Sequence, residues 1–139
     1  MGSGRDRLIA LARAHAAAEA RGDLAATLAT LDPEPVYELF PVGLAFRGMA
    51  ATRAYYDHFF SSFLPRVAGH RLRSEWVSDE GVGQEYEIEL RVEGGGTERH
   101  RVIGILTFGR EALSGERVWG SERLLRLMFG PVYQQAAPL

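Results

Sequence analysis

The sequence contains no cysteine, which excludes disulfide bonds, thiolate catalysis and cysteine-based zinc sites together. It has no apolar run of about 18 residues, and its polar start lacks the apolar stretch of a signal peptide. Neither sign of charge is in strong excess, because 16 basic and 18 acidic residues leave a net charge of -2. A chain with this balance has no general attraction to nucleic acid or anionic lipid. We therefore expect a cytoplasmic protein that binds neither nucleic acid nor membranes.

The composition is that of one folded domain. A length of 139 residues is usual for a single domain and leaves little room for a second core. Hydrophobic residues make up 46% and charged residues 24%, which is ordinary for a globular protein and unlike a disordered one. Repeats, low-complexity tracts and interdomain linkers are absent from the sequence. We expect one domain over residues 1–139, with its core at about 5–130.

The pattern of apolar residues predicts helices first and an antiparallel meander afterwards. Strong helix formers with apolar residues on one face follow Arg5, Asp23 is placed to cap a second short helix, and Pro65 ends a third. The second half alternates apolar and polar residues, and Gly94-Gly95-Gly96 marks a hairpin turn. The expected helices are 5–21, 23–31, 48–64 and 122–129, and the expected strands are 36–40, 44–47, 69–79, 83–93, 97–108 and 113–120.

The side-chain period also predicts how these strands pair. In the strand 84–93 the even positions from 86 to 92 are apolar and the odd positions are mostly acidic, so its two faces have opposite character. A three-residue glycine turn would pair Leu90 with His100 and keep charge off the apolar face. A two-residue turn would instead set Ile88 against Arg101. The first register is therefore expected.

One face of the meander is then a ladder of opposite charges that marks the solvent side. The turn near Asp79 pairs Arg73 with Glu87, and the whole ladder comprises Arg71, Arg73, Glu87, Glu89, Arg99 and Arg101. The helices must cover the other face, which gives a layered α+β core. That inner face carries Leu72, Trp76, Tyr86, Ile88, Leu90, Val102, Leu106 and Phe108. His70 and His100 also fall on it, and titratable groups on an apolar concave face are typical of a ligand site.

The order of elements resembles the cone fold of the nuclear-transport-factor-2-like superfamily. Local motifs resemble its SnoaL-like polyketide cyclase and ketosteroid isomerase branches. These motifs are Ala20-Arg21-Gly22-Asp23-Leu24 at the first helix joint, Phe40-Pro41-Val42-Gly43 with Phe46-Arg47-Gly48 at the hairpin, and Gly115-Glu116-Arg117-Val118-Trp119 on the last strand. The resemblance covers residues 5–130. It implies an α+β fold in which a cone-shaped, curved antiparallel sheet wraps around the N-terminal helices.

The catalytic groups of those branches are only partly matched. The isomerases carry an Asp base where this chain has Phe40, an acid where it has Gly104, and a tyrosine donor where it has His15. The cyclases often place an Asp after the aromatic residue of the last strand, where this chain has Ser121. No Asp follows Asp79, which argues against the Asp-Arg-Asp water activation of limonene-epoxide-hydrolase-like members. Steroid isomerisation by the family mechanism is therefore not expected.

Three residues are candidates for acid–base catalysis: His15, His100 and Glu38. An imidazole suits either role at neutral pH, although His15 on its apolar stripe could equally be a core or rim residue that bonds to the backbone. Glu38 shares parity with Phe40, and two positions are open for it: it points inward, where burial would raise its pKa and make it a base, or it forms a rim ion pair with Arg47 or with an arginine of the third helix.

Metal binding is not expected. His70 and His100 lie on strands two columns apart, which separates them by about 9–10 Å, too far to share one ion. Two interpretations remain for this pair: they are polar groups of the pocket, with Glu98 close to His100, or they are ordinary polar residues whose hydrogen bonds are made within the protein. We expect no cofactor. Residues expected to line the pocket are Phe40, Tyr55, Phe59, His70, Trp76, Tyr86 and Trp119.

These patterns support two interpretations of function. The first is a SnoaL-like pocket protein that binds a small apolar or aromatic molecule, with cofactor-free isomerase, cyclase or hydratase chemistry if it is an enzyme. The second is a non-catalytic binding or scaffold domain whose open sheet face forms a dimer. Sheet-mediated dimers are common in the families that this chain resembles, and Ile103 and Ile105 offer an apolar patch on the charged face. A homodimer is therefore expected.

Overall fold

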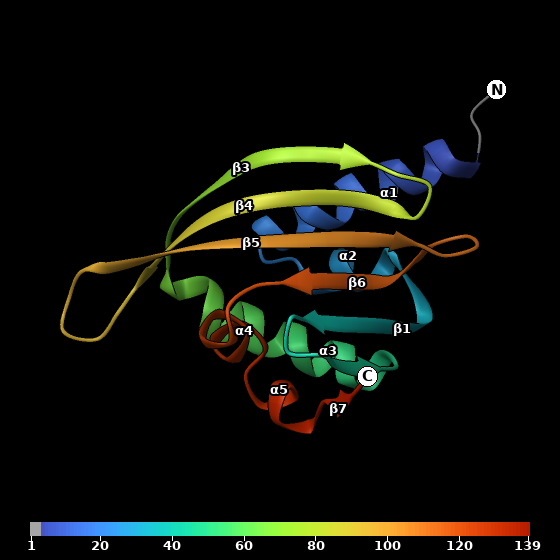
Figure 1. The fold of residues 1–139 in the computed structure, drawn as a ribbon. Helices are drawn as coiled ribbons and strands as arrows, with labels where there is room; N and C mark the ends of the chain where they lie inside the picture. The colour runs from blue at the N-terminus through green and yellow to red at the C-terminus, as the bar shows by residue number, and fades with distance from the viewer. Residues whose placement is uncertain (1–3) are drawn as a thin grey trace.

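A computed structural model of the chain describes residues 4–139, so the polar start at 1–3 lies outside the described residues (Figure 1). The α-helices of this part are α1 (Gly4–Ala20), α2 (Leu24–Ala29), α3 (Met49–His58), α4 (Glu122–Phe129) and α5 (Pro131–Gln135). Its strands are β1 (Leu31–Phe40), β2 (Leu44–Arg47), β3 (Val67–Val77), β4 (Gly81–Arg91), β5 (Thr97–Phe108), β6 (Leu113–Trp119) and β7 (Ala137–Pro138). None of the helices in 4–139 is long and apolar enough to cross a membrane.

Local signals in the sequence set most helix ends. The side chain of Asp23 accepts a hydrogen bond from the backbone N–H of Ala26 at 3.0 Å and caps α2 as predicted. Ser121 caps α4 in the same way through the N–H of Leu124 at 3.1 Å. The predicted third helix is regular only as far as His58, because a π turn (Phe59–Phe63) and a 3-10 turn (Leu64–Arg66) complete it. Helix α5 and strand β7 were not predicted.

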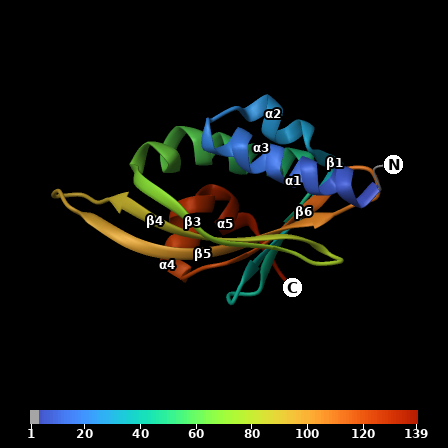
Figure 2. The ribbon, with the colours of Figure 1, turned by 90° about the horizontal axis from the view of Figure 1, so that it is seen from above.

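The strands form one open, curved sheet in the order β3-β4-β5-β6-β1-β2-β7. Neighbouring strands are antiparallel except β1 and β6, which are parallel. Seen from above, α1, α2 and α3 lie together on the concave side of the sheet (Figure 2). The core between these layers is rich in aromatic rings, and Tyr55 stacks on Phe129 with ring centroids 4.2 Å apart. The predicted α+β cone with N-terminal helices is therefore confirmed.

The registers of the long hairpins differ from the prediction by two residues. His100 pairs with Ile88 instead of Leu90, and Glu87 pairs with Arg71 instead of Arg73. The β4–β5 loop is longer than three residues, because the last pair joins Arg91 to Thr97 and the glycines between them all have positive φ. A slip of two residues returns every side chain to its own face, so the predicted faces of β4 and β5 survive.

The charged face is present, with shifted partners. Arg101 binds Glu85 at 2.6 Å and Glu87 at 3.1 Å, and Arg99 binds Glu89 at 3.2 Å. The arginines are exposed and the glutamates are partly exposed, so each pair contributes only about 0–1 kcal/mol. They keep this face of the sheet in water.

A β-bulge in β3 overturns the prediction for Trp76. Leu72 pairs with Tyr86 and Ser74 pairs with Glu85, so Arg73 is an extra residue without a partner in the ladder. The bulge reverses the alternation beyond it and places Trp76 on the outer face, 38% exposed. There its indole covers Gly83, where a Cβ would lie 2.1 Å from the ring.

The alternation predicted for β1 is also wrong. Tyr37 and Leu39 are completely buried, whereas Glu38 and Phe40 are only half-buried on the opposite face. The parallel pairing with β6 explains this, because it sets Tyr37 beside Glu116 on the helix-covered side. Glu38 therefore points away from the core instead of into it.

Candidate functional site

A cavity of about 110 Å³ lies between α1, the aromatic turn after α3 and the inner face of strands β3 to β6. Most of its wall is apolar and is formed by Phe59, Phe63, Leu64, Val67, Tyr86, Ile88, Val102, Leu106, Val118 and Met128. Its polar groups are His15, Glu19, His70, Gln84 and Glu116. An apolar pocket with a few convergent polar groups is the usual form of a small-molecule site.

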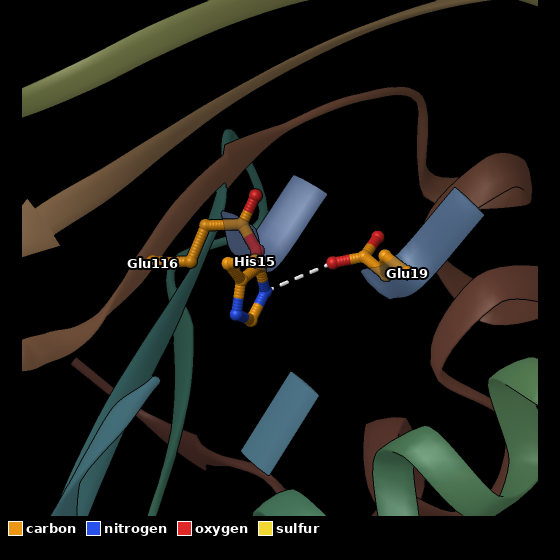
Figure 3. A group of neighbouring side chains, drawn as sticks. All are labelled: His15, Glu19 and Glu116. Carbon is orange, nitrogen blue, oxygen red and sulfur yellow. Dashed lines mark ion pairs between the residues drawn. The ribbon is translucent and has the colours of Figure 1, made fainter. Parts of the chain in front are cut away.

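Helix geometry brings two of these polar groups together. His15 and Glu19 are four residues apart on α1, so their side chains lie one above the other on the face that covers the sheet. His15 is completely buried, and its Nε2 lies 2.9 Å from Oε2 of Glu19. Figure 3 shows this pair beside Glu116, with the ion pair drawn as a dashed line.

The hydrogen bonds of His15 fix which ring nitrogen carries a proton. Its Nδ1 lies 2.8 Å from the hydroxyl of Thr30, and that hydroxyl donates its only proton to the carbonyl of Thr27 at 2.7 Å. The Thr30 oxygen can therefore only accept from His15, so Nδ1 is protonated. Nε2 is left to face Glu19 and the hydroxyl of Tyr56, which lies 2.9 Å away.

A proton must also lie between His15 and Glu19. Two bare acceptors at 2.9 Å would repel each other, and Nδ1 already holds the proton of a neutral ring. The contact is therefore either an imidazolium beside a carboxylate or a neutral carboxylic acid that donates to Nε2. In both states the pair can exchange a proton with a molecule in the cavity.

Glu116 supplies the third group and projects from β6. Gly115, with φ of 143°, allows the close approach of β6 to β1, since a Cβ there would lie 1.8 Å from the carbonyl of Val36. Gly104 on β5 leaves the space that the carboxyl occupies, because a Cβ at Gly104 would lie 2.2 Å from Oε2 of Glu116. The carboxyl of Glu116 forms no hydrogen bond or ion pair with any residue of 4–139.

Burial raises the pKa of Glu116 well above the usual value for a glutamate, and the negative charge of Glu19 raises it further. A carboxyl in this environment keeps its proton at pH values where an exposed glutamate is ionised. Glu116 is thus a proton donor that faces an apolar cavity, beside a pair that can accept a proton. Two neighbouring titratable groups in different states are typical of acid–base sites.

Buried tyrosines continue the network away from the cavity. The hydroxyl of Tyr56 lies 2.6 Å from that of Tyr37 and 3.4 Å from Oε2 of Glu19. Burial raises the pKa of both tyrosines well above the ordinary value, so they remain protonated hydrogen-bond donors. They hold the His15–Glu19 pair in place without titrating themselves.

The same three residues are the ones that could hold a metal ion. One ligand atom from each of His15, Glu19 and Glu116 lies within 4.8 Å of the others. A divalent ion would need Glu116 deprotonated and the His15–Glu19 proton removed, and it would have to complete its coordination with water.

Four of the ten residues predicted for the site line this cavity: His15, Phe59, His70 and Tyr86. The other two predicted catalytic residues lie elsewhere. Glu38 is on the outer face of β1. His100 lies outside the cavity wall, and its Nε2 is 3.0 Å from Oε1 of Glu98. Glu98 is itself held by the guanidinium of Arg123 on α4.

The remaining predicted pocket residues also lie outside the cavity wall. Tyr55 is completely buried in the aromatic core. Phe40 stacks on Trp119 with ring centroids 4.9 Å apart on the outer face, and Trp76 is on that face because of the bulge.

Sequence reasoning missed Glu19, Glu116, Tyr56 and Gln84 as polar groups in or beside the cavity. Two signals could have found the glutamates. Glu19 lies four residues after His15 on a helix, and Glu116 shares its parity with the apolar Val118 on the same strand. The alternation of β6 therefore carries an acidic residue onto the inner face.

Comparisons with known proteins agree with this architecture. The sequence matches the family model of the SnoaL-like domain over residues 12–113. A search of curated proteins gives no match. A candidate polyketide cyclase from Xanthomonas campestris pv. campestris superposes with a TM-score of 0.66 at 21% identity, covering 91% of this chain and 98% of that one.

Two further solved structures share the fold. An NTF-2-like protein from Burkholderia xenovorans LB400 gives a TM-score of 0.65 at 20% identity, covering 86% of this chain and 87% of that one. The epoxide hydrolase/cyclase-like enzyme SalBIII has a role in pyran ring formation in the polyether salinomycin. It superposes with a TM-score of 0.67 at 14% identity, covering 86% of this chain and 94% of that one. At these identities the likeness concerns the fold.

Proposed function

The chain belongs to the SnoaL-like domain family, and from that premise we propose that its cavity binds a small, largely apolar molecule and acts on it by acid–base catalysis without a cofactor. The reaction class is a cyclisation or an isomerisation, in which atoms are rearranged and none is added. Glu116 is the acid, and the His15–Glu19 pair is the base.

One observation carries this proposal: the carboxyl of Glu116 lines an apolar cavity, and no residue of 4–139 partners it. Its raised pKa keeps it protonated, and the groups of His15 and Glu19 lie within 4.8 Å of it. A bound molecule can therefore receive a proton on one atom while it loses one from another nearby. Glu116 is half-buried, and no buried polar side-chain atom of 4–139 lacks a hydrogen-bond partner, so its unpaired carboxyl oxygens are open to the cavity, where a ligand or water can bind them.

A small epoxy alcohol illustrates the balance of such a reaction. The hydroxyl oxygen attacks an epoxide carbon, the carbon–oxygen bond of the epoxide breaks, and a cyclic ether forms. Glu116 gives its proton to the epoxide oxygen, and the His15–Glu19 pair takes the proton of the attacking hydroxyl. Water then carries the proton from the His15–Glu19 pair back to Glu116, which restores both groups. The reaction therefore requires no oxidant, reductant or metal.

The test measures ring closure of short epoxy alcohols by gas chromatography, with proton exchange of cyclopentanone in D₂O as the assay for isomerase chemistry. We expect turnover in one of the two assays. Its rate should fall at least about 100-fold in Glu116→Gln, because that variant has lost its general acid. Glu93→Gln, an exposed loop substitution, is the matched control and should leave the rate unchanged. If no molecule of the panel shifts the NMR methyl resonances of Val102, Leu106 or Val118, the cavity is not a binding site and the proposal fails.

The outer face of the sheet supports a second proposal, self-association. Phe40, Trp119 and Ile103 are neighbours across three strands, and none of the three is fully buried. Ile105 and Trp76 continue this apolar strip, which is half-buried to exposed. A homodimer formed there should dissociate in Ile103→Arg, as measured by analytical ultracentrifugation. A monomeric wild type at high micromolar concentration would contradict it.

A further inference from the structure

The cavity has an unusual balance of charge. Its wall includes two carboxyl groups, those of Glu19 and Glu116, and none of its lining residues is an arginine. Arginines of residues 4–139 bind glutamates, aspartates or backbone carbonyls on the outside of the fold. Arg101 and Arg123 are examples, and each binds a glutamate there. A negative charge that developed on a bound molecule would therefore meet two glutamates, and the ring of His15, when it is protonated, is already paired by Glu19.

The hydrogen-bond donors near the ligand are also few. His15 directs Nδ1–H to Thr30, away from the cavity, and its Nε2 is engaged by Glu19 and Tyr56. The side chain of Gln84 donates to Glu75 at 2.8 Å. Apart from the protonated carboxyl of Glu116 and the exposed ring of His70, the polar groups of the wall direct these donors to other residues, so the cavity does not present the converging set of donors that stabilises an enolate.

The apolar wall favours positive charge as well. Phe59 and Tyr86 present aromatic rings to the cavity, and aromatic faces attract cations. The cavity, with a volume of about 110 Å³, is partly open to solvent and somewhat smaller than a cavity of about 150 Å³ that holds benzene. The enclosed part of a ligand is therefore a compact hydrocarbon body of about six heavy atoms, with its basic atom at the glutamates.

We propose that this site is built to stabilise positive charge on its ligand, so that its substrates are molecules that become cationic on protonation, such as epoxides and cyclic ethers, and not ketones that react through enolates. The inference rests on the proposed function of the cavity and selects among its chemistries. Protonated amines of matching shape should then bind as stable analogues of the cationic intermediate, with nitrogen between Glu19 and Glu116.

This arrangement predicts that an ammonium ion displaces the proton of Glu116. The pKa of Glu116 is raised by burial and by Glu19, and an ammonium ion beside both carboxyls opposes the second effect. The titratable groups that face Glu116 are Glu19 and His15 from α1, Tyr37 from β1, Tyr56 from α3, His70 from β3 and Tyr86 from β4. Burial raises the pKa of the tyrosines and keeps them protonated, so we expect the proton released on amine binding to come from the carboxyl of Glu116 at pH values below its folded-state pKa.

The test compares three ligands of one shape by isothermal titration calorimetry: cyclopentylamine, cyclopentanol and cyclopentanecarboxylate. We expect the amine to bind at least tenfold more tightly than the alcohol at pH 8, and the carboxylate not to bind. Titrations in two buffers with different ionisation enthalpies, repeated from about pH 5 to 9, should show proton release for the amine at pH values below the folded-state pKa of Glu116 and none for the alcohol. Below the pKa of Glu116, amine affinity should fall about tenfold per pH unit.

Variants separate this inference from the proposed function. Glu116→Gln should abolish proton release and reduce the preference for amine over alcohol to less than threefold, whereas the exposed control Glu93→Gln should change neither. If the alcohol or the carboxylate binds as well as the amine, the cationic preference is refuted while the cavity remains a binding site. If no ligand binds and no cavity resonance moves, both proposals fail. Displacement of the amine by micromolar Mn²⁺ would instead make the site a metal centre and also refute the inference.

Discussion

Replacement of Glu116 by glutamine is expected to stabilise the folded protein at neutral pH, although the same change should abolish its chemistry. Glutamine has nearly the same shape, so it fits the space that Gly104 leaves, and its amide can donate a hydrogen bond toward Glu19. The substitution therefore removes the cost of ionising a buried carboxyl without opening a void.

The magnitude follows from proton linkage. The pKa of Glu116 is higher in the folded chain than in the unfolded one, so the folded state holds more protons and its stability falls as the pH rises. This contribution is fully present below the unfolded value of 4.5 and is lost as the pH rises through the folded-state pKa. Across that window the wild type should lose about 1.4 kcal/mol of unfolding free energy per pH unit relative to Glu116→Gln.

The assay is urea unfolding of both proteins by circular dichroism at half-unit steps from pH 4 to 9. The difference in unfolding free energy should grow from about pH 4.5 and then reach a plateau, and the pH of that plateau reports the folded-state pKa of Glu116. Glu19→Gln should move the plateau to lower pH, because it removes the negative charge that raises this pKa. A difference that stays constant from pH 4 to 9 would refute the reasoning, and Glu93→Gln should show that constancy.

Three further substitutions test the surroundings of the site. Gly104→Ala should displace only the flexible end of Glu116, so it should lower the unfolding free energy by less than about 1 kcal/mol and change how that free energy depends on pH. Gly81→Ala should lower the unfolding free energy more, because its new Cβ would lie 2.2 Å from a backbone carbonyl oxygen. Equal losses of unfolding free energy in urea would contradict this. Tyr56→Phe leaves the buried hydroxyl of Tyr37 without its partner and should cost about 1–3 kcal/mol, with the double phenylalanine variant recovering part of the loss in a mutant cycle. Asp23→Ala removes the cap of α2 and should lower the unfolding free energy by about 1 kcal/mol without altering amine binding by calorimetry.

The fold could be predicted from the sequence because each element has a clear local signal. Period-two alternation marks β4 and β5, and the capping residue Asp23 can be recognised from its position before a run of helix formers. Strand registers were less certain, since a loop that is two residues longer still keeps each side chain on the same face. The observed slip in the β4–β5 pairing is of this kind.

The site was predicted only in part, for a different reason. His15 could be found because its place on the apolar stripe of α1 is a local property. Glu116 acquires its character from tertiary structure: the parallel pairing of β6 with β1, the space at Gly104 and the proximity of Glu19. Glu38 was chosen from parity alone, and the pairing that sets the parity of β1 joins strands far apart in the sequence.

The extra residue at Arg73 decides which side chains of β3 face the cavity. With the bulge, Glu75 lies on the cavity side and hydrogen-bonds Gln84, while Trp76 covers Gly83 outside. Deletion of Arg73 would leave Ser74, Glu75 and Trp76 opposite the same residues of β4, so each would keep its face. Entry of Arg73 into the ladder would instead shift the residues beyond it by one position and turn the indole to the inner face. The choice between a bulge and a regular ladder thus decides whether this cavity stays open or is filled, and relatives with a strand of the same length but no bulge should carry the side chain at this position inside.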